Sequence, residues 1–353
     1  LFRSIGLLLQ PTGVYSRVPL IRRHLGLACS LAVGFLAATL LCLWGRSVDG
    51  WLEDAVWASQ PETAGDRSIV IIEISDATLK KWPEPLALMG SRFGALTDAL
   101  RTAGAKMAVF DFVHSAEPDG LLDAWGSSVL PNQIWADAID RWPEGVAMGV
   151  TESASGSLLT PSGDILVSGT VAERLGAIDI GIRTSEVNRE VELYVRSAEG
   201  VLPSLPMQAY SLSRGTTARR LIESDRLEPV MRLSAGRRWQ TLGAEHVVSG
   251  NLSQSQWDSL NGAVAIVAMT HSGSRDVHLK PGRKAVIGAQ IVADVLSALQ
   301  SRESLRVLPQ NARTGFLLVL ALLFPFACQA ARGWALLIGT LSLLALVLMN
   351  WPA

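Results

Sequence analysis

Three long runs of uncharged, apolar residues are the strongest constraint on how this chain can fold. They cover residues 25–45, 314–331 and 333–353. Each run has about the 20 residues that a helix needs to cross the hydrocarbon core of a bilayer. Hydrocarbon offers no partners to free backbone groups, so runs this rich in Leu and Ala indicate helices rather than barrel strands. The sequence therefore predicts three transmembrane helices.

The first run has a second interpretation, a cleaved signal peptide. Its uncharged stretch is longer than the apolar core of a signal peptide, and no small-x-small cleavage site follows Trp44. We therefore expect residues 25–45 to remain in the protein as a membrane anchor.

Basic residues that flank the first run predict its orientation. Arg3, Arg17, Arg22 and Arg23 precede it, and that segment contains no acidic residue. Lys and Arg flanking a span are retained on the cytoplasmic side. We therefore expect residues 1–24 to be cytoplasmic, and the first span to export everything up to the second.

The expected organisation has five parts. A cytoplasmic segment is followed by one span, one large extracytoplasmic domain and two further spans. In residue numbers these parts are 1–24, 25–45, 46–312, 313–331 and 333–352.

Cysteine positions and net charge exclude two classes of protein. Cys29, Cys42 and Cys328 all lie in predicted spans, so disulfides are not the framework of the exported domain. A domain of this size buries enough core without them. The net charge of −1 argues against a nucleic-acid partner.

The exported domain begins with a strand, a helix and a second strand. Residues 68–74 and 106–111 are short, β-branched or apolar runs typical of buried strands. Between them, residues 91–103 have apolar positions at helical spacing, and we expect Ser91 to cap this helix and Gly104 to end it. Such a unit predicts parallel pairing of its two strands.

The rest of the domain continues this alternation and predicts an α/β fold: a mostly parallel sheet with flanking helices. Residues 263–269 form another apolar strand, and residues 287–299 form an amphipathic helix leading toward the second span. Residues 216–257 are polar and poorly periodic, which favours an irregular insertion with a few edge strands. Weaker candidates are helices at 133–141 and 205–212, strands at 146–150 and 192–196, and a loop or hairpin at 151–169.

Several motifs in this domain, taken in order, resemble one known family. Residues 71–79 read Ile-Ile-Glu-Ile-Ser-Asp-Ala-Thr-Leu, and residues 100–111 read Leu-Arg-Thr-Ala-Gly-Ala-Lys-Met-Ala-Val-Phe-Asp. They are similar to the opening strand and to the Ala-Gly-Ala-Lys motif of the type-two CHASE family, the cyclase/histidine-kinase-associated sensory extracellular domains of bacteria.

The later motifs of that family also have counterparts. These are Leu-Gly-Ala-Ile-Asp-Ile-Gly at 175–181, Leu-Pro-Ser-Leu-Pro at 202–206, Leu-Asn-Gly-Ala-Val-Ala-Ile-Val at 260–267, Arg-Asp-Val-His-Leu-Lys-Pro at 275–281 and Ile-Gly-Ala-Gln-Ile-Val-Ala-Asp at 287–294. The resemblance covers roughly residues 68–309, with one span before and two after. It implies a sensory, periplasmic domain in a multi-pass protein of the bacterial inner membrane.

The chain departs from the family's pattern at several positions. Ser75 stands where the family commonly has the first of two Asp residues, Ile287 replaces the usual Pro, and His114 stands where an aromatic residue is common. No family ligand is therefore transferred to this chain.

Polar side chains that follow predicted strands form the candidate ligand site. Asp76 and Asp111 follow the first two strands, and the 270–276 loop follows the last. Ligands of open parallel sheets bind outside the carboxyl ends of the strands. The candidates are Asp76, Asp111, Arg275, Asp276 and His278.

Each of these residues also has a purely structural interpretation. Asp after a strand is often a helix cap or a turn former, which is an equal alternative for Asp76. Arg275 could pair with an acid and fix its loop. If Asp111 and Asp276 share one site, a carboxylate there could bind a cationic group and the Arg275 guanidinium an anionic group. Such a site would suit a polar or zwitterionic ligand.

Catalytic and metal chemistry have weaker support. His271, Asp276 and His278 have side chains that bind metals, but their spacing matches no standard metal signature. Ser204 lacks the G-x-S-x-G context of a nucleophile. We expect no cofactor, no metal and no catalytic residue here, and we expect any catalytic output domain to lie beyond residue 353.

The sequence thus favours a sensor or receptor subunit that binds an extracytoplasmic small ligand or protein and transmits the change to its membrane helices. Membrane lipid is an expected partner. A homodimer or a larger membrane complex is also expected, since Gly34 and Ala38 offer a small-residue face for helix contact. Two alternatives stay open: an accessory or scaffolding subunit without signalling output, and a periplasmic metal-dependent enzyme.

Overall fold

The structure is a computed structural model that describes most of the predicted exported domain. It describes residues 54–55, 58–59 and 63–302, apart from 125, 127, 154–155, 169–170, 181–186, 198–199, 226–229, 234–236, 275 and 283. Val56–Leu305 forms one compact unit. The three predicted spans lie outside the described residues. Within the described part, no helix is both long enough and apolar enough to cross a bilayer.

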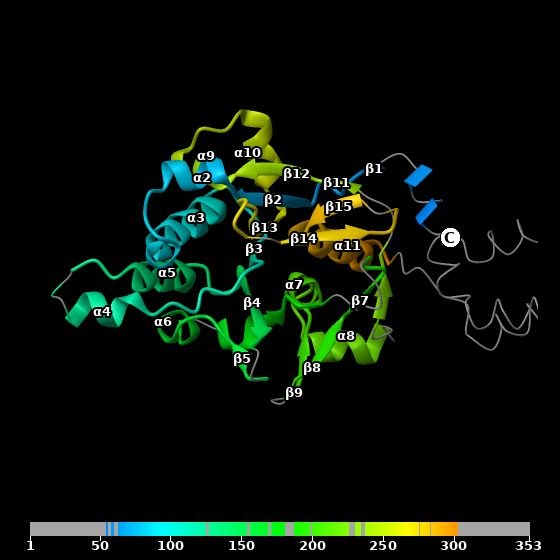
Figure 1. Cartoon of the computed structure of the whole chain (residues 1–353), viewed down its shortest axis with the longest axis horizontal. Coiled ribbons are helices and arrows are strands. Elements are labelled where there is room, and N and C mark those ends of the chain that lie inside the picture. Colours follow the sequence, from blue (N-terminus) through cyan, green and yellow to red (C-terminus); the bar gives the residue numbers. More distant parts are fainter. Residues whose placement is uncertain are drawn as a thin grey trace, which may run out of the picture. The chain divides into compact units, whose positions relative to one another are not determined.

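A mostly parallel sheet forms the centre of the unit, which confirms the predicted α/β fold (Figure 1). The strand order is β12-β2-β13-β3-β4-β5, and β6 also pairs with β4. All of these pairings are parallel except that of β5 with β4. The strands are β2 (Ile69–Ile74), β3 (Met107–Phe110), β4 (Val146–Glu152), β5 (Leu158–Leu159), β6 (Leu175–Ala177), β12 (Gln240–Gly243) and β13 (Val264–Met269).

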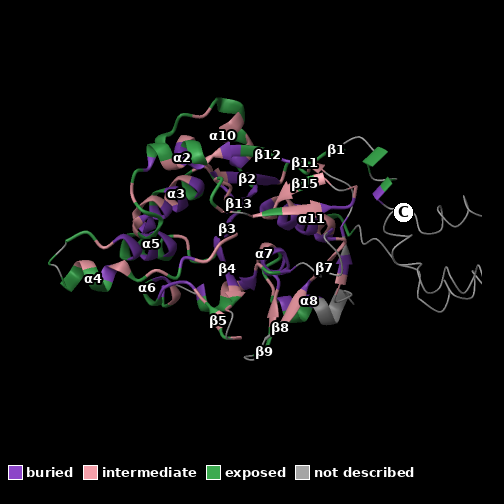
Figure 2. Ribbon diagram, viewed as in Figure 1, coloured by how far each residue is buried: buried purple, intermediate pink, exposed green. Residues whose placement is uncertain are grey.

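The central strands are apolar at nearly every position because both faces of the sheet are covered. In β2, Ile69 and Ile71 belong to one buried cluster, whereas Val70 and Ile72 belong to the other. Successive side chains of a strand point to opposite faces, and a parallel sheet covered on both faces needs apolar residues on both. Figure 2 shows these strands buried between the helices.

Two groups of helices cover the two faces (Figure 1). The first group packs its apolar residues with Val70 and Ile72, and the second packs with Ile69 and Ile71. The first group contains α2 (Asp76–Lys81), α3 (Gly90–Thr102), α5 (Pro131–Asp140), α6 (Gly163–Leu166), α9 (Ala244–Ser249) and α10 (Gln254–Leu260). The second contains α7 (Leu205–Ser213), α8 (Ala218–Asp225) and α11 (Gly288–Ser301).

Short elements outside the main sheet complete the unit. The β14–β15 hairpin matters most for the site, because its first strand lies beside the start of α11. These elements are β1 (Thr63–Ala64), η1 (Leu86–Leu88), α4 (Pro118–Ala124), η2 (Val171–Arg174), β7 (Glu190–Glu192), β8 (Tyr194–Ser197), β9 (Gly200–Pro203), β10 (Val230–Arg232), β11 (Arg237–Arg238), β14 (Val277–Lys280) and β15 (Lys284–Ile287).

The predicted strand-helix-strand unit is present, but its two strands do not pair with each other. The helix predicted at 91–103 is α3, and Gly104, with φ of 76°, follows it. Few residues other than glycine adopt this left-handed conformation at low cost. The strands β2 and β3 are parallel, but β13 lies between them.

Three predictions about the domain are wrong. Ser91 does not cap α3, because it lies inside the helix, which begins at Gly90 after Met89 and has no side-chain cap hydrogen bond. The strand predicted at 192–196 is divided between β7 and β8, which pair with β10 and β9. The segment 216–257 is not an irregular insertion, because it contains α8, α9 and the start of α10, as well as the edge strand β12. These helices are only six to eight residues long and largely polar, so each has few apolar positions from which a helical period could be recognised.

A buried ion pair attaches the β14–β15 hairpin to α11. The Lys280 ammonium contacts the Asp294 carboxylate, and both side chains are 2% exposed. Trp239 Nε1 donates to the other carboxylate oxygen of Asp294 at 3.0 Å. Removing one partner of such a pair leaves a buried charge uncompensated, so the pair fixes the hairpin on the helix and thereby one wall of the site.

Candidate functional site

A cavity of about 770 Å³ lies at the carboxyl ends of β3, β4, β6 and β13. The start of α11, the strand β14 and the segment before β7 form its other walls. This volume lies within the range of about 300–1,000 Å³ that is typical of small-molecule sites. The strand ends of an open parallel sheet are also where ligands usually bind.

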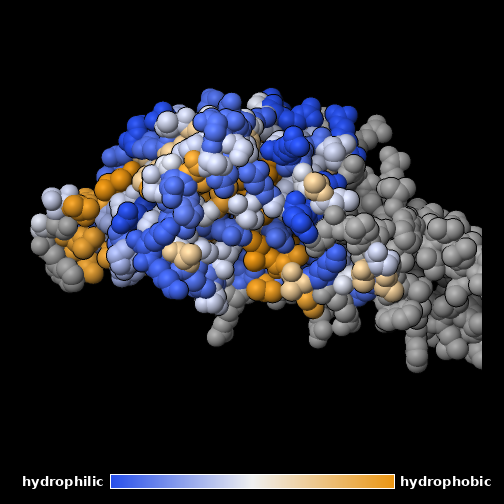
Figure 3. Space-filling model, turned by 90° about the horizontal axis from the view of Figure 1, so that it is seen from above, coloured by the Kyte–Doolittle hydropathy of each residue, from blue (hydrophilic) through white to orange (hydrophobic). Residues whose placement is uncertain are grey.

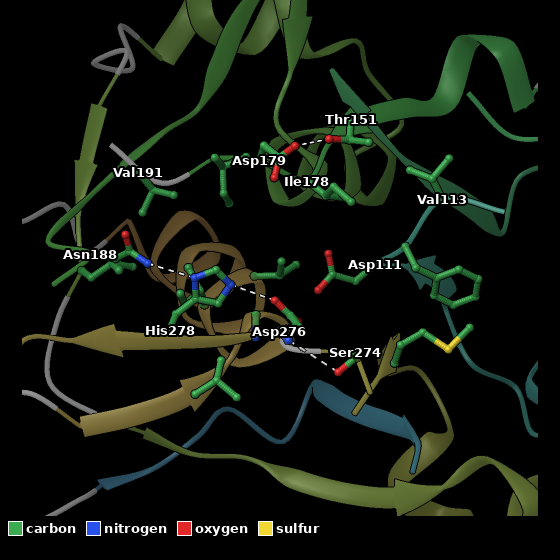
Figure 4. A pocket seen from close by; sticks show the side chains of 18 of the residues that line it. Asp111, Val113, Thr151, Ile178, Asp179, Asn188, Val191, Ser274, Asp276 and His278 are labelled. Atoms are coloured by element: carbon green, nitrogen blue, oxygen red, sulfur yellow. Dashed lines mark hydrogen bonds and ion pairs between the residues drawn. The ribbon is translucent and has the colours of Figure 1, made fainter. Parts of the chain in front are cut away.

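Asp111 lies where β3 ends and points into the cavity (Figure 4). Its backbone N–H donates to Val267 O on the neighbouring strand at 2.8 Å, which fixes the residue at the sheet edge. The side chain keeps some accessible surface beside the cavity, yet protein atoms surround it densely. Burial, followed by repulsion from Asp276, raises the pKa of Asp111 to about 7, although His278 opposes the shift.

Asp276 and His278 are joined in a chain of hydrogen bonds that ends at a helix (Figure 4). Asp276 Oδ1 lies 2.7 Å from His278 Nε2, and Asp276 Oδ2 accepts from Gly288 N at 3.0 Å. Asn188 Nδ2 lies 3.1 Å from His278 Nδ1. The Asp276 carboxylate therefore caps α11 from outside the helix. It lies near the positive end of the helix dipole, where an acidic group interacts favourably with the helix.

Gly288 is required at this helix start by the close approach of Asp276. A Cβ atom at position 288 would lie 2.5 Å from Asp276 Oδ2 and 2.6 Å from Oδ1. No side chain could occupy that space unless the carboxylate moved. The helix begins with Gly in the place where the carboxylate reaches its backbone.

Asp179 lines the opposite wall of the cavity. It follows β6, and its carboxylate accepts a hydrogen bond from the Thr151 hydroxyl at the end of β4. The pKa of Asp111 is raised in part by the charge of Asp179, so the two carboxyls influence each other across the cavity. Glu190, at the start of β7, is a further acidic lining residue.

The structure brings three of the five candidate residues together. Asp111, Asp276 and His278 line one cavity, because β2, β13 and β3 are neighbours in the sheet and β14 follows β13. Asp76 does not line it. Its carboxylate accepts from the Ser272 N–H and hydroxyl at 3.1–3.3 Å and so holds the 270–276 loop. Arg275 lies outside the described residues.

Sequence reasoning missed Asp179 and Asn188. Asp179 follows the short strand β6, so applying the strand-end rule to residues 175–178 would have found it. Asn188 had no such signal. It lies between strands, and its N–H donates to Leu279 O at 2.7 Å across a long sequence separation.

The metal hypothesis for His271, Asp276 and His278 requires all three side chains to converge. Asp276 and His278 are in contact, but His271 accepts from Gly273 N and does not line the cavity. In the part of the chain that the structure describes, no group of three or more His, Cys, Asp or Glu residues could hold a metal ion.

Much of the face drawn in Figure 3 is hydrophilic, but apolar side chains gather on parts of it, including the end of the domain that contains α4. Leu121 and Val129, exposed by 54% and 56%, lie in and after this helix.

Comparison with known proteins gives one result. A family model described as the CHASE2 domain matches residues 28–326. No curated protein and no solved structure matches the chain significantly.

Proposed function

This chain belongs to the CHASE2 domain family, a family of extracellular sensory domains, and from that premise we propose that it is a sensor that binds a small ligand in the cavity beside Asp111. In this proposal residues 46–312 are periplasmic, in a multi-pass protein of the bacterial inner membrane. Family membership supports sensing rather than catalysis.

One observation supports this function best: the cavity is built around the start of α11. Gly288, Ile291 and Val292, in the first turns of the helix, line the cavity, and Asp276 is bonded to the first of them. A ligand that engages Asp276 or presses on Ile291 acts directly on the helix start. If the helix α11 can take two positions, the ligand changes which position is favoured only by binding one of them more tightly than the other.

The length and sequence position of α11 support transmission to the membrane. The helix runs from Gly288 to Ser301, and at about 1.5 Å per residue it spans roughly 20 Å. Residues 302–312 separate its end from the predicted span at 313–331. We propose that ligand binding displaces α11, and that this displacement changes the position of that span relative to residues 25–45. A homodimer or a larger membrane complex would carry the change onward.

A small-molecule screen tests this function. The Tm of the full chain in lipid nanodiscs is measured with and without each of a set of cationic, anionic and neutral metabolites. The same measurements are made on an Ile178→Trp variant. Ile178 lines the cavity (Figure 4), so the larger ring fills part of it. Val167→Trp is the matched control, because Val167 is 82% exposed and does not line the cavity.

We expect at least one compound to stabilise the wild type and the Val167→Trp variant but not the Ile178→Trp variant. If Ile178→Trp does not fold, Val113→Trp at the cavity rim takes its place. A screen in which no compound distinguishes the cavity variant from the control would refute ligand sensing by this cavity.

A further inference from the structure

The charge balance of the cavity restricts the chemistry of its ligand. Asp111, Asp179, Glu190 and Asp276 line it, and His278 is the only titratable base among its described lining residues. An acidic lining alone does not define a ligand, because carboxyl groups are often neutralised by neighbouring protein groups. The partners of each group decide how much negative charge is left for a ligand.

Both ring nitrogens of His278 have protein partners. Asn188 Nδ2 lies 3.1 Å from Nδ1, and Asp276 Oδ1 lies 2.7 Å from Nε2. Asp276 Oδ2 accepts from Gly288 N at 3.0 Å. Both carboxylate oxygens of Asp276 are therefore engaged by protein groups, so the direct contact with a ligand falls to another carboxyl group of the cavity.

Among the carboxyl groups that line the cavity, Asp111 is the one without a hydrogen-bond partner in the described part of the chain. Its carboxyl points into the cavity (Figure 4) and forms no hydrogen bond with any described side chain or backbone group. Protein surrounds it, and the neighbouring charges of Asp276 and Asp179 repel it. A bound cation would remove both penalties at once, because it supplies the missing donor and offsets the like charges.

Apolar walls favour an organic cation over a metal ion. Ile178, Val191 and Ile291 line the cavity, with Val113 at its rim. A metal ion would leave this apolar surface facing water, and within the described region no three His, Cys, Asp or Glu side chains are arranged so that they could hold a metal ion together. A hydrocarbon body would instead bury the apolar surface, at about 25 cal/mol per Å².

We infer that the ligand of this cavity is a small organic cation, whose ammonium or guanidinium group donates to Asp111 and whose hydrocarbon part packs on Ile178 and Val191. The inference rests on the proposed function, because it names the chemical class recognised by the same site. Asp276 and Asp179 then favour the cation without contacting it directly.

A matched series of four-carbon molecules tests the charge preference. Putrescine carries two ammonium groups, 4-aminobutanoate carries one ammonium and one carboxylate, succinate carries two carboxylates, and 1,4-butanediol is neutral. Binding to the full chain in nanodiscs is measured by isothermal titration calorimetry at pH 8. We expect putrescine to bind more tightly than 4-aminobutanoate, and both to bind more tightly than the other two.

Two variants locate the cation in the cavity. Asp111→Asn removes the charge at the proposed contact and should weaken putrescine binding by about ten- to a hundredfold, the range for losing a charge-assisted hydrogen bond. Asp258→Asn removes a carboxylate from an exposed position on α10, and should leave the affinity unchanged. Equal affinities of putrescine for the Asp111→Asn variant and the wild type would overturn the inference.

The metabolite screen tests ligand sensing, and the four-carbon series tests the preference for a cation, so the two hypotheses can be refuted independently. If succinate or butanediol binds more tightly than putrescine, and Ile178→Trp abolishes that binding, the cation inference is wrong and ligand sensing stands. If neither ammonium-bearing probe binds at 10 mM while anionic or neutral metabolites pass the screen, the inference is again wrong. If no compound of any class passes the screen, both are wrong.

Discussion

Replacing Asp111 with Asn should make the ligand-free protein more stable, and the gain should grow with pH. Burial, followed by repulsion from Asp276, raises the pKa of Asp111 from 3.8 to about 7 in the folded protein. Asn has nearly the same shape and never ionises, so it avoids the cost of an enclosed negative charge. A residue kept for binding at the expense of stability is expected to behave in this way.

The sign and size of the effect follow from proton linkage. Because the folded protein holds the Asp111 proton more tightly than the unfolded chain does, the wild type loses stability as pH rises from about 4 to about 7. At about 1.4 kcal/mol per pH unit, the loss above pH 7 amounts to as much as about 4 kcal/mol. The variant should therefore match the wild type below about pH 4 and exceed it by up to this amount at pH 8.

Thermal unfolding of the full chain in nanodiscs, freed of ligand by dialysis, measures this difference. For a domain of this size about 4 kcal/mol corresponds to a difference in Tm of roughly 10 °C between variant and wild type at pH 8. Asp258→Asn, on the exposed face of α10, should show no such dependence on pH. An Asp111→Asn variant that is less stable than the wild type at every pH would refute the reasoning, because Asp111 would then be a structural residue.

Three further predictions follow from other contacts of the site. Gly288→Ala should lower the free energy of unfolding by about 1–2 kcal/mol, measured by urea denaturation, because its Cβ displaces the Asp276 carboxylate that caps α11; an unchanged stability would contradict this. Lys280→Met should cost about 3–5 kcal/mol in the same assay, because Asp294 remains buried without its cation, and a loss below about 1 kcal/mol would show that the pair does not fix the hairpin. The affinity for putrescine should fall about tenfold from pH 8 to pH 6 by calorimetry, because Asp111, with a pKa of about 7 set by burial and by Asp276, Asp179 and His278, binds a proton in that range; an unaltered affinity would contradict the role of Asp111.

The sequence was most informative about the fold where elements are long or uniformly apolar. The β-branched run at 69–74 and the periodic helix at 90–102 appear within one residue of the predicted bounds. Pairing was not accessible in the same way, because the insertion of β13 between β2 and β3 depends on contacts between segments far apart in the chain. A parallel pair predicted from consecutive strands remains open to a third strand between them.

For the site, the rule that ligands bind at strand ends predicted that Asp111 and Asp276 lie together at one edge of the sheet, and both residues line the cavity there. It did not separate residues that line the cavity from those that hold its loops, since Asp76 follows a strand equally well and bonds to Ser272 instead. The raised pKa of Asp111 and the His278 to Asn188 contact depend on three-dimensional enclosure. No local pattern in the sequence encodes that enclosure.

Cysteine labelling in intact cells tests the central claim, an extracytoplasmic sensory domain, most directly. Val167→Cys, at a position that is 82% exposed, is introduced after Cys29, Cys42 and Cys328 are replaced by Ser. A membrane-impermeant maleimide that crosses only the outer membrane should label this residue, and should leave a Ser16→Cys variant unlabelled until the inner membrane is opened. Labelling of Val167→Cys only after that membrane is opened would place the domain in the cytoplasm and contradict the account.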